Sequence, residues 1–178
     1  MNLLAQISEP AASFPWVWVL VALGVGYLLG SVLFAVPVSR RCGVDIFKAG
    51  SGNPGATNVK RAVGKKAGNL VFALDALKGL VATLWPLLCF SGDGVVYLQI
   101  AGLAGALMGH SFSCWYGFRG GKAVSTTIGA LVGIMPLAIL AGLIVWLLVF
   151  YTTRYVSVAS LALAVKKSTL TSPPFKWQ

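Results

Sequence analysis

The sequence predicts an all-α, polytopic membrane protein, a transmembrane helical bundle of about five full spans plus the start of a sixth. Apolar residues make up 57% of the 178-residue chain, its mean hydropathy is +0.83, and only 10% of its residues are charged. Soluble domains carry roughly 25% charged residues, so a soluble globule is excluded. The charges are also unbalanced, with 14 Lys and Arg against 4 Asp and Glu and a net charge of +10. Such an excess is typical of a membrane protein with basic surfaces on one side.

Apolar stretches that carry no charge, or only Asp75 and Lys78 in the case of 67–92, locate the spans. The first covers 14–38 and exceeds the ~20 residues that a helix needs to cross the hydrocarbon core. No Lys or Arg precedes Arg40, so we interpret this stretch as a retained span and not as a secretory signal peptide. The spans that follow are expected at 67–92, at 95–109 and within the neutral stretch 123–153.

The neutral stretch has two interpretations. One tilted helix would leave Arg154 outside the cell, whereas two shorter helices turning at Pro136 would return Arg154 to the cytoplasm. The second agrees with the rule that short basic loops stay in the cytoplasm. The apolar run at 156–165 is too short to cross. We therefore expect one integral-membrane domain over 1–165, incomplete at its end, and a divergent polar tail over 166–178.

The distribution of Lys and Arg predicts the orientation. Residues 39–66 contain Arg40, Arg41, Lys48, Lys60, Arg61, Lys65 and Lys66. Arg119 and Lys122 lie in the next loop on the same side, whereas the stretch before the first span contains no Lys or Arg. The N-terminus is thus predicted outside and both basic loops in the cytoplasm.

The first basic loop has the composition of an anion site. From Gly50 to Arg61 it reads GSGNPGATNVKR. Its glycines let the backbone approach a phosphate, and Ser and Thr add hydroxyl donors. The planar guanidinium group of Arg can donate two parallel hydrogen bonds to the phosphate. The candidates are Gly50, Ser51, Gly52, Asn53, Gly55, Thr57, Asn58 and Arg61. Neither nucleotide-binding glycine pattern occurs in this loop. The alternative is a polar turn whose cations face anionic lipid headgroups.

The second basic loop repeats this chemistry with His110, Gly120, Gly121 and Lys122. If a helix begins at about Lys122, the glycine N–H groups and the helix N-terminus point at the same anion. The competing interpretation of Lys122, Arg119 and Lys48 is that they are interfacial cations with their stems along the membrane. For His110 it is a hydrogen-bonded structural residue.

The remaining titratable residues argue against metal chemistry. Asp75 and Lys78 lie three apart on a predicted helix, where a structural ion pair competes with a proton relay. Too few carboxylates accompany the single histidine to bind a metal, and the three cysteines form no CxxC pair. We expect no metal, no cofactor and no nucleic-acid partner.

Taken together, several segments resemble a known family. They are Leu29-Gly30-Ser31, GSGNPGATNVKRAVGKKAG from Gly50, Leu74 to Gly79 with its Asp75 and Lys78, Gly109-His110, and FRGGKAVST from Phe118. The chain resembles the bacterial acyl-phosphate-dependent glycerol-3-phosphate acyltransferases of the integral-membrane type, over about Gly26 to Ala162.

The resemblance implies a seven-helix enzyme of the bacterial inner membrane. It would transfer a fatty acyl group from acyl phosphate to the 1-hydroxyl of glycerol 3-phosphate, giving lysophosphatidic acid for phospholipid synthesis. The family's essential serine and arginine correspond to Ser51 and Arg61, and its glycerol-phosphate loop corresponds to Gly120, Gly121 and Lys122. Expected partners are acyl phosphate, glycerol 3-phosphate, membrane lipid and a soluble enzyme that produces acyl phosphate.

The chain departs from the family pattern at several positions. Ala123 replaces the last glycine of the usual Gly-Gly-Lys-Gly, Ser113 replaces a customary proline, and Arg119 stands where lysine is also common. The family's final helix with its His and Asn is missing, so we expect a truncated chain with impaired activity. A small transporter or channel for an anionic solute is the alternative function, and a non-catalytic scaffold is a third.

Overall fold

The structure is a computed structural model that describes residues 16–92 and 94–153. Every regular element in this described part is helical, which confirms the all-α prediction. The elements are α1 (Val17–Ser31), α2 (Ala35–Arg41), α3 (Ala56–Ala62), α4 (Lys65–Cys89), α5 (Val95–Ser111), the short 3₁₀ helix η2 (Cys114–Tyr116), α6 (Val124–Ile134) and α7 (Pro136–Thr153). The chain divides into two compact units between Ile134 and Met135, and the first unit contains α1 to α6.

Three segments are long and apolar enough to cross a membrane: Val17–Arg41, Lys65–Cys89 and Val95–Tyr116. Two further apolar helical stretches, Val124–Ile134 and Pro136–Val149, are shorter. The neutral stretch 123–153 is divided at the proline, as the second interpretation predicts, since α6 ends at Ile134 and α7 begins at Pro136. The expected sixth segment and the polar tail lie outside the described residues.

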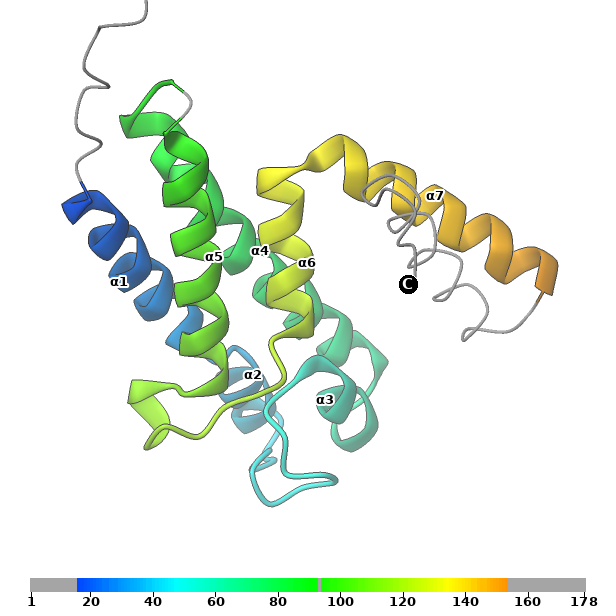
Figure 1. Cartoon of the computed structure of the whole chain (residues 1–178). Helices are drawn as coiled ribbons and strands as arrows, with labels where there is room; N and C mark the ends of the chain where they lie inside the picture. The colour runs from blue at the N-terminus through cyan, green and yellow to red at the C-terminus, as the bar shows by residue number, and fades with distance from the viewer. Residues whose placement is uncertain (1–15, 93, 154–178) are drawn as a thin grey trace, which may run out of the picture. The chain divides into compact units, whose positions relative to one another are not determined.

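Glycines bring α1 and α5 into close contact, and Figure 1 shows the two helices side by side. A Cβ added at Gly26 or Gly30 of α1 would collide with the backbone of α5. A Cβ at Gly105 or Gly109 of α5 would likewise collide with the backbone of α1. Lipid tails are as apolar as leucine, so helices in a membrane associate through such close backbone packing.

A second glycine-lined contact joins α4 to α6. Gly79 of α4 and Gly129 of α6 each face the backbone of the opposite helix without room for a Cβ. Polar side chains add to this contact, because the Thr83 hydroxyl donates to Ala130 O at 3.1 Å. Gln99 Nε2 of α5 donates to Thr83 O at 3.0 Å and to Gly133 O at 3.3 Å, so one amide connects three helices.

The helix is interrupted between α1 and α2, which leaves carbonyl groups inside the bundle without helical partners. Lys78 of α4 satisfies two of them, because its Nζ donates to Gly30 O at 2.9 Å and to Val32 O at 2.5 Å. The Ser113 hydroxyl donates to Ser31 O at 2.6 Å. Backbone groups at membrane depth need such internal partners, since hydrocarbon supplies none. Ser113, a departure from the family pattern, therefore has a structural role here.

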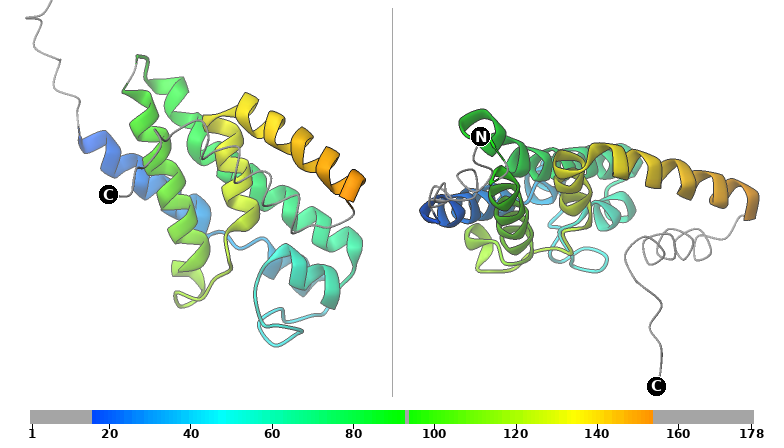
Figure 2. Two further views of the ribbon diagram at one scale, coloured as in Figure 1. Left: turned by 45° about the vertical axis from the view of Figure 1, so that its right-hand side comes forward. Right: turned by 45° about the horizontal axis from the view of Figure 1, so that its top comes forward.

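The two glycine-rich loops lie at the same end of the first unit. Figures 1 and 2 show α2, α3 and the loop between α5 and α6 together at the end where α4 begins. Beneath them lies an apolar cluster formed by Leu33, Ala35, Val36, Val38, Ile46, Val59 and Val71. This cluster supports both loops from the helical body.

Candidate functional site

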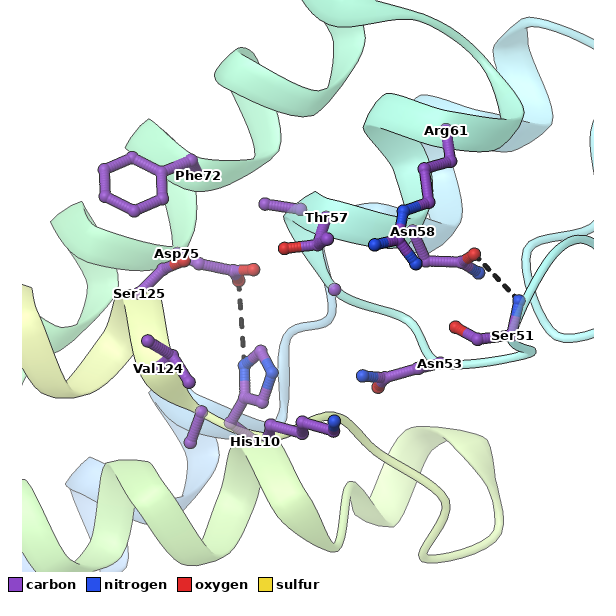
Figure 3. A pocket seen from close by; sticks show the side chains of 14 residues that line it. Ser51, Asn53, Thr57, Asn58, Arg61, Phe72, Asp75, His110, Val124 and Ser125 are labelled. Carbon is purple, nitrogen blue, oxygen red and sulfur yellow. Dashed lines mark hydrogen bonds and ion pairs between the residues drawn. The ribbon is translucent and has the colours of Figure 1, made fainter. Parts of the chain in front are cut away.

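A cavity of about 360 Å³ lies where the two loops meet the ends of α4, α5 and α6 (Figure 3). Its lining comprises Ser51, Asn53, Gly55, Ala56, Thr57, Asn58, Arg61, Phe72, Asp75, His110, Lys122, Ala123, Val124 and Ser125. Eight of the predicted site residues are among these: Ser51, Asn53, Gly55, Thr57, Asn58, Arg61, His110 and Lys122. The structure thus brings together side chains from both loops.

Four predicted site residues, Gly50, Gly52, Gly120 and Gly121, lie outside the lining. Gly50 and Gly52 have φ of 58° and 69°, a left-handed conformation that glycine adopts without strain. They shape the first loop so that Ser51 faces the cavity.

Asn58 holds this loop in place. Its side chain is buried, its Oδ1 accepts the Ser51 N–H at 3.0 Å, and its Nδ2 donates to Ala49 O at 2.9 Å. Because both ends of the amide are engaged by the loop, Asn58 positions Ser51. The sequence pattern predicts Asn58 as a contact of the anion, whereas both polar atoms of its amide bind the loop itself.

The second loop differs from the prediction in the role of its glycines and in the residue at which the following helix begins. The Gly121 N–H donates to His110 O at 2.9 Å, so it is not directed at a ligand as expected. A Cβ at Gly120 would meet the carbonyl oxygens of His110 and Ser111. Both glycines therefore allow close packing of the loop on the end of α5. Helix α6 begins at Val124, two residues after the predicted start, and its first residues Val124 and Ser125 line the cavity.

Arg61 and Lys122 supply the cationic side of the cavity. Both side chains are exposed, and no carboxylate within 16–92 and 94–153 forms an ion pair with either. They come from α3 and from the second loop. Two unpaired cations facing one hollow form a site for a polyanion such as a phosphate.

The other two loop cations are engaged elsewhere. Arg119 places its Cζ 4.7 Å from the centre of the Phe47 ring, and Lys48 lies 3.9 Å from Asp45. Neither residue lines the cavity. Both cations therefore lie outside the predicted anion site.

Ala123 and Phe118 have φ of 55° and 57°, in the left-handed region that is costly for residues with a Cβ. The penalty is roughly 1–2 kcal/mol for each residue. Ala123 replaces a glycine of the family pattern, so the substitution carries a conformational cost where the loop enters α6. Its buried methyl group also lines the cavity beside Lys122.

Asp75 lines the cavity although the sequence pattern does not place it among the predicted site residues. It is 1% exposed, and its Oδ1 lies 2.9 Å from Lys78 Nζ, which confirms the predicted ion pair. The same oxygen lies 3.8 Å from His110 Nδ1. The sequence signal for Asp75 is a carboxylate inside a predicted span. Burying such a charge costs free energy, so the group is expected to have a partner or a function.

The ammonium group of Lys78 has no capacity left for a passing anion. Its three N–H groups face Asp75, Gly30 O and Val32 O, and the side chain is 5% exposed. A transporter for an anionic solute would need a free cation within the spans, and Lys78 does not supply one.

In the described part of the chain, groups of three or more His, Cys, Asp or Glu that could bind a metal are absent.

Comparison with known proteins identifies the family of this chain. The profile of the family described as Glycerol-3-phosphate acyltransferase matches residues 20–172. A glycerol-3-phosphate acyltransferase from Aquifex aeolicus (strain VF5) is 45% identical over 139 residues, covering 78% of this chain and 71% of the relative. The enzyme of that name from Allorhizobium ampelinum is 42% identical over 157 residues, covering 88% of this chain and 73% of the relative.

Two solved structures of an integral membrane acyltransferase also match this chain. PlsY (YgiH), an integral membrane glycerol 3-phosphate acyltransferase, has a glycerol 3-phosphate form that superposes with a TM-score of 0.67 at 41% identity. Its lysphosphatidic acid form superposes with a TM-score of 0.66. Both alignments cover 83% of this chain and 72% of the solved chain. The chain belongs to the glycerol-3-phosphate acyltransferase family.

Proposed function

We propose that this protein transfers a fatty acyl group from acyl phosphate to the 1-hydroxyl of glycerol 3-phosphate and releases lysophosphatidic acid. The observation that carries the proposal is the convergence of Ser51 and Arg61 from one loop with Lys122 from another on a single cavity. Family membership and the PlsY forms named for glycerol 3-phosphate and lysphosphatidic acid support the acceptor and the product.

The chemistry suits a site rich in cations. Acyl phosphate is a mixed anhydride with a good leaving group, so the enzyme mainly has to bring two anions together and neutralise their charge. The 1-hydroxyl oxygen attacks the acyl carbon, the bond from that carbon to the phosphate oxygen breaks, and the released phosphate takes the hydroxyl proton. Ser51, Arg61 and Lys122 bind the phosphate groups.

The apolar lining gives the acyl chain a path. Phe72 of α4 and Val124 of α6 line the cavity and are 45% and 61% exposed. Because these side chains lie on helices that pack against each other at the bundle surface, we place the acyl chain along them, with its tail in the lipid. The product then enters the bilayer directly.

The proposal is tested with the purified full chain in lipid vesicles, supplied with labelled glycerol 3-phosphate and an acyl donor. We expect labelled lysophosphatidic acid from palmitoyl phosphate and none from the matching thioester of coenzyme A. Product formed only from the thioester would overturn the donor assignment. Label that enters the vesicles without any covalent product would instead support the transporter.

We also propose that both loops face the cytoplasm, where the soluble enzyme that makes acyl phosphate can reach them. Three exposed free cysteines test this orientation: Cys42 and Cys114 at the loop end, and Cys89 at the opposite end of α4. In intact spheroplasts, a membrane-impermeant maleimide is expected to label a variant that retains only Cys89. Variants that retain only Cys42 or Cys114 should react after the membrane is opened. The reverse pattern would contradict the orientation.

A further inference from the structure

The His110 ring is held on one edge by α4 and α6. Its Nδ1 lies 3.3 Å from the Thr126 hydroxyl and 3.8 Å from Asp75 Oδ1. The side chain is 3% exposed, and its backbone carbonyl accepts the Gly121 N–H. The ring therefore has little freedom to rotate.

The other edge of the ring faces the two loops. A Cβ added at Gly121 would overlap His110 Nε2 and would lie 3.3 Å from Asn53 Oδ1. Figure 3 shows the ring between Asp75 on one side and the loop that bears Asn53 on the other. Because Gly121 has no side chain, no Cβ covers Nε2, and His110 belongs to the lining of the cavity.

The partners of Nδ1 determine whether Nε2 donates or accepts a hydrogen bond. The carboxylate oxygen of Asp75 can only accept, which favours the proton on Nδ1, and the Thr126 oxygen is placed to accept it as well. Nε2 is then an acceptor in a cavity where Arg61 and Lys122 can only donate. Fully ionised phosphate and acyl phosphate groups carry no donor for it. The hydroxyl groups of a polyol do.

We propose that His110 accepts a hydrogen bond from the 2-hydroxyl of glycerol 3-phosphate, and that Asp75 and Thr126 are positioning residues that keep Nε2 available. The inference rests on the proposed function, in which the proton of the 1-hydroxyl leaves with the phosphate. Among the groups of the two substrates, the 2-hydroxyl is then the donor that remains for Nε2. His110 thus selects glycerol 3-phosphate over phosphates that lack this hydroxyl and directs acylation to position 1.

The test compares glycerol 3-phosphate with 3-hydroxypropyl phosphate, which has the reacting hydroxyl and the phosphate but no 2-hydroxyl. For the unmodified chain, kcat/KM is expected to be roughly 10- to 100-fold higher with glycerol 3-phosphate, because the analogue leaves a buried acceptor unpaired. In His110→Phe the preference is expected to fall below about threefold. Lys66→Ala, an exposed cation away from the cavity, serves as the matched control and keeps the preference of the unmodified chain.

A second variant changes only the support of the ring. Thr126→Val removes the hydroxyl at Nδ1 without altering the cavity lining, and it is expected to reduce the preference, whereas Thr126→Ser retains it. This pair also remains informative if His110→Phe fails to fold. Since His110 is the single histidine of the chain, ¹⁵N NMR of histidine-labelled protein reports its tautomer directly, and protonation at Nδ1 is expected.

Several results would overturn the inference. These are equal kcat/KM for the two phosphates in the unmodified chain, an undiminished preference in His110→Phe, a proton found on Nε2, or one limb of the pH–rate profile lost in His110→Phe. The last would make His110 the base for the reacting hydroxyl. All are distinguishable from failure of the proposed function, in which the unmodified chain acylates neither phosphate.

Discussion

Lys122→Ala is expected to lower kcat/KM for acyl transfer by about 100- to 1000-fold, a loss of the size found when one preorganised electrostatic contact of an acyl-transfer site is removed. Lys122 is exposed and lines the cavity, and no carboxylate in the described residues neutralises it. Its charge is therefore available to a phosphate. Arg61→Ala should have a similar effect. Arg61→Lys should recover only part of it, because an ammonium group cannot form the two parallel bonds of a guanidinium.

The measurement is initial-rate kinetics in vesicles with both substrates varied. Lys66→Ala provides the matched control, since Lys66 is an exposed cation of α4 that does not line the cavity. Circular dichroism of each variant should match the unmodified chain, because neither Arg61 nor Lys122 is buried. A loss below about threefold in both Lys122→Ala and Arg61→Ala would contradict the two-loop anion site.

The second large effect is expected at Lys78. Lys78→Met leaves the buried carboxylate of Asp75 without its cation and removes the donor to Gly30 O and Val32 O. Breaking a buried ion pair by removing one partner typically costs 3–5 kcal/mol, so the free energy of unfolding should fall by about that amount. The interruption between α1 and α2 should be the first part of the bundle to loosen.

Denaturation in mixed detergent micelles, followed by circular dichroism, measures this change. The double variant Asp75→Asn/Lys78→Met is expected to recover part of the stability, because it no longer buries an unpaired charge, while the two carbonyl groups still lack their donor. Lys66→Met controls for the loss of a lysine. If Lys78→Met and Lys66→Met unfold at the same detergent composition, the ion pair does not support the bundle.

Much of the architecture could be predicted from the sequence, because hydropathy and charge are read locally. The uncharged stretch 14–38 and the run after Lys66 correspond to segments long enough to cross a membrane. Pro136 marked the break between α6 and α7. The interruption between α1 and α2 was missed, because its carbonyl groups are satisfied by Lys78 and Ser113, which lie 46 to 82 residues away in the chain.

The chemistry of the site could be predicted better than its geometry. Glycines, hydroxyl groups and cations in two loops indicated an anion site, and Ser51, Arg61 and Lys122 do line one cavity. The sequence could not show that the amide of Asn58 is used within the loop, or that the Gly121 N–H is taken by His110 O. Hydrogen-bond partners depend on loop conformation, which residue types alone do not specify.

Membrane insertion, helical content and the anionic character of the ligand follow from properties that each segment carries independently of the others, namely apolar length, glycine content and unbalanced charge. Only the packed bundle determines that Asp75 lies beside His110. The same packing makes Lys78 the hydrogen-bond donor to the interruption between α1 and α2. Glycines on α1, α4, α5 and α6 set how closely the backbones approach, and that spacing brings side chains from distant segments into contact. Folding therefore assigns these polar groups their roles, because a buried charge or carbonyl is stable only beside a partner that another helix supplies.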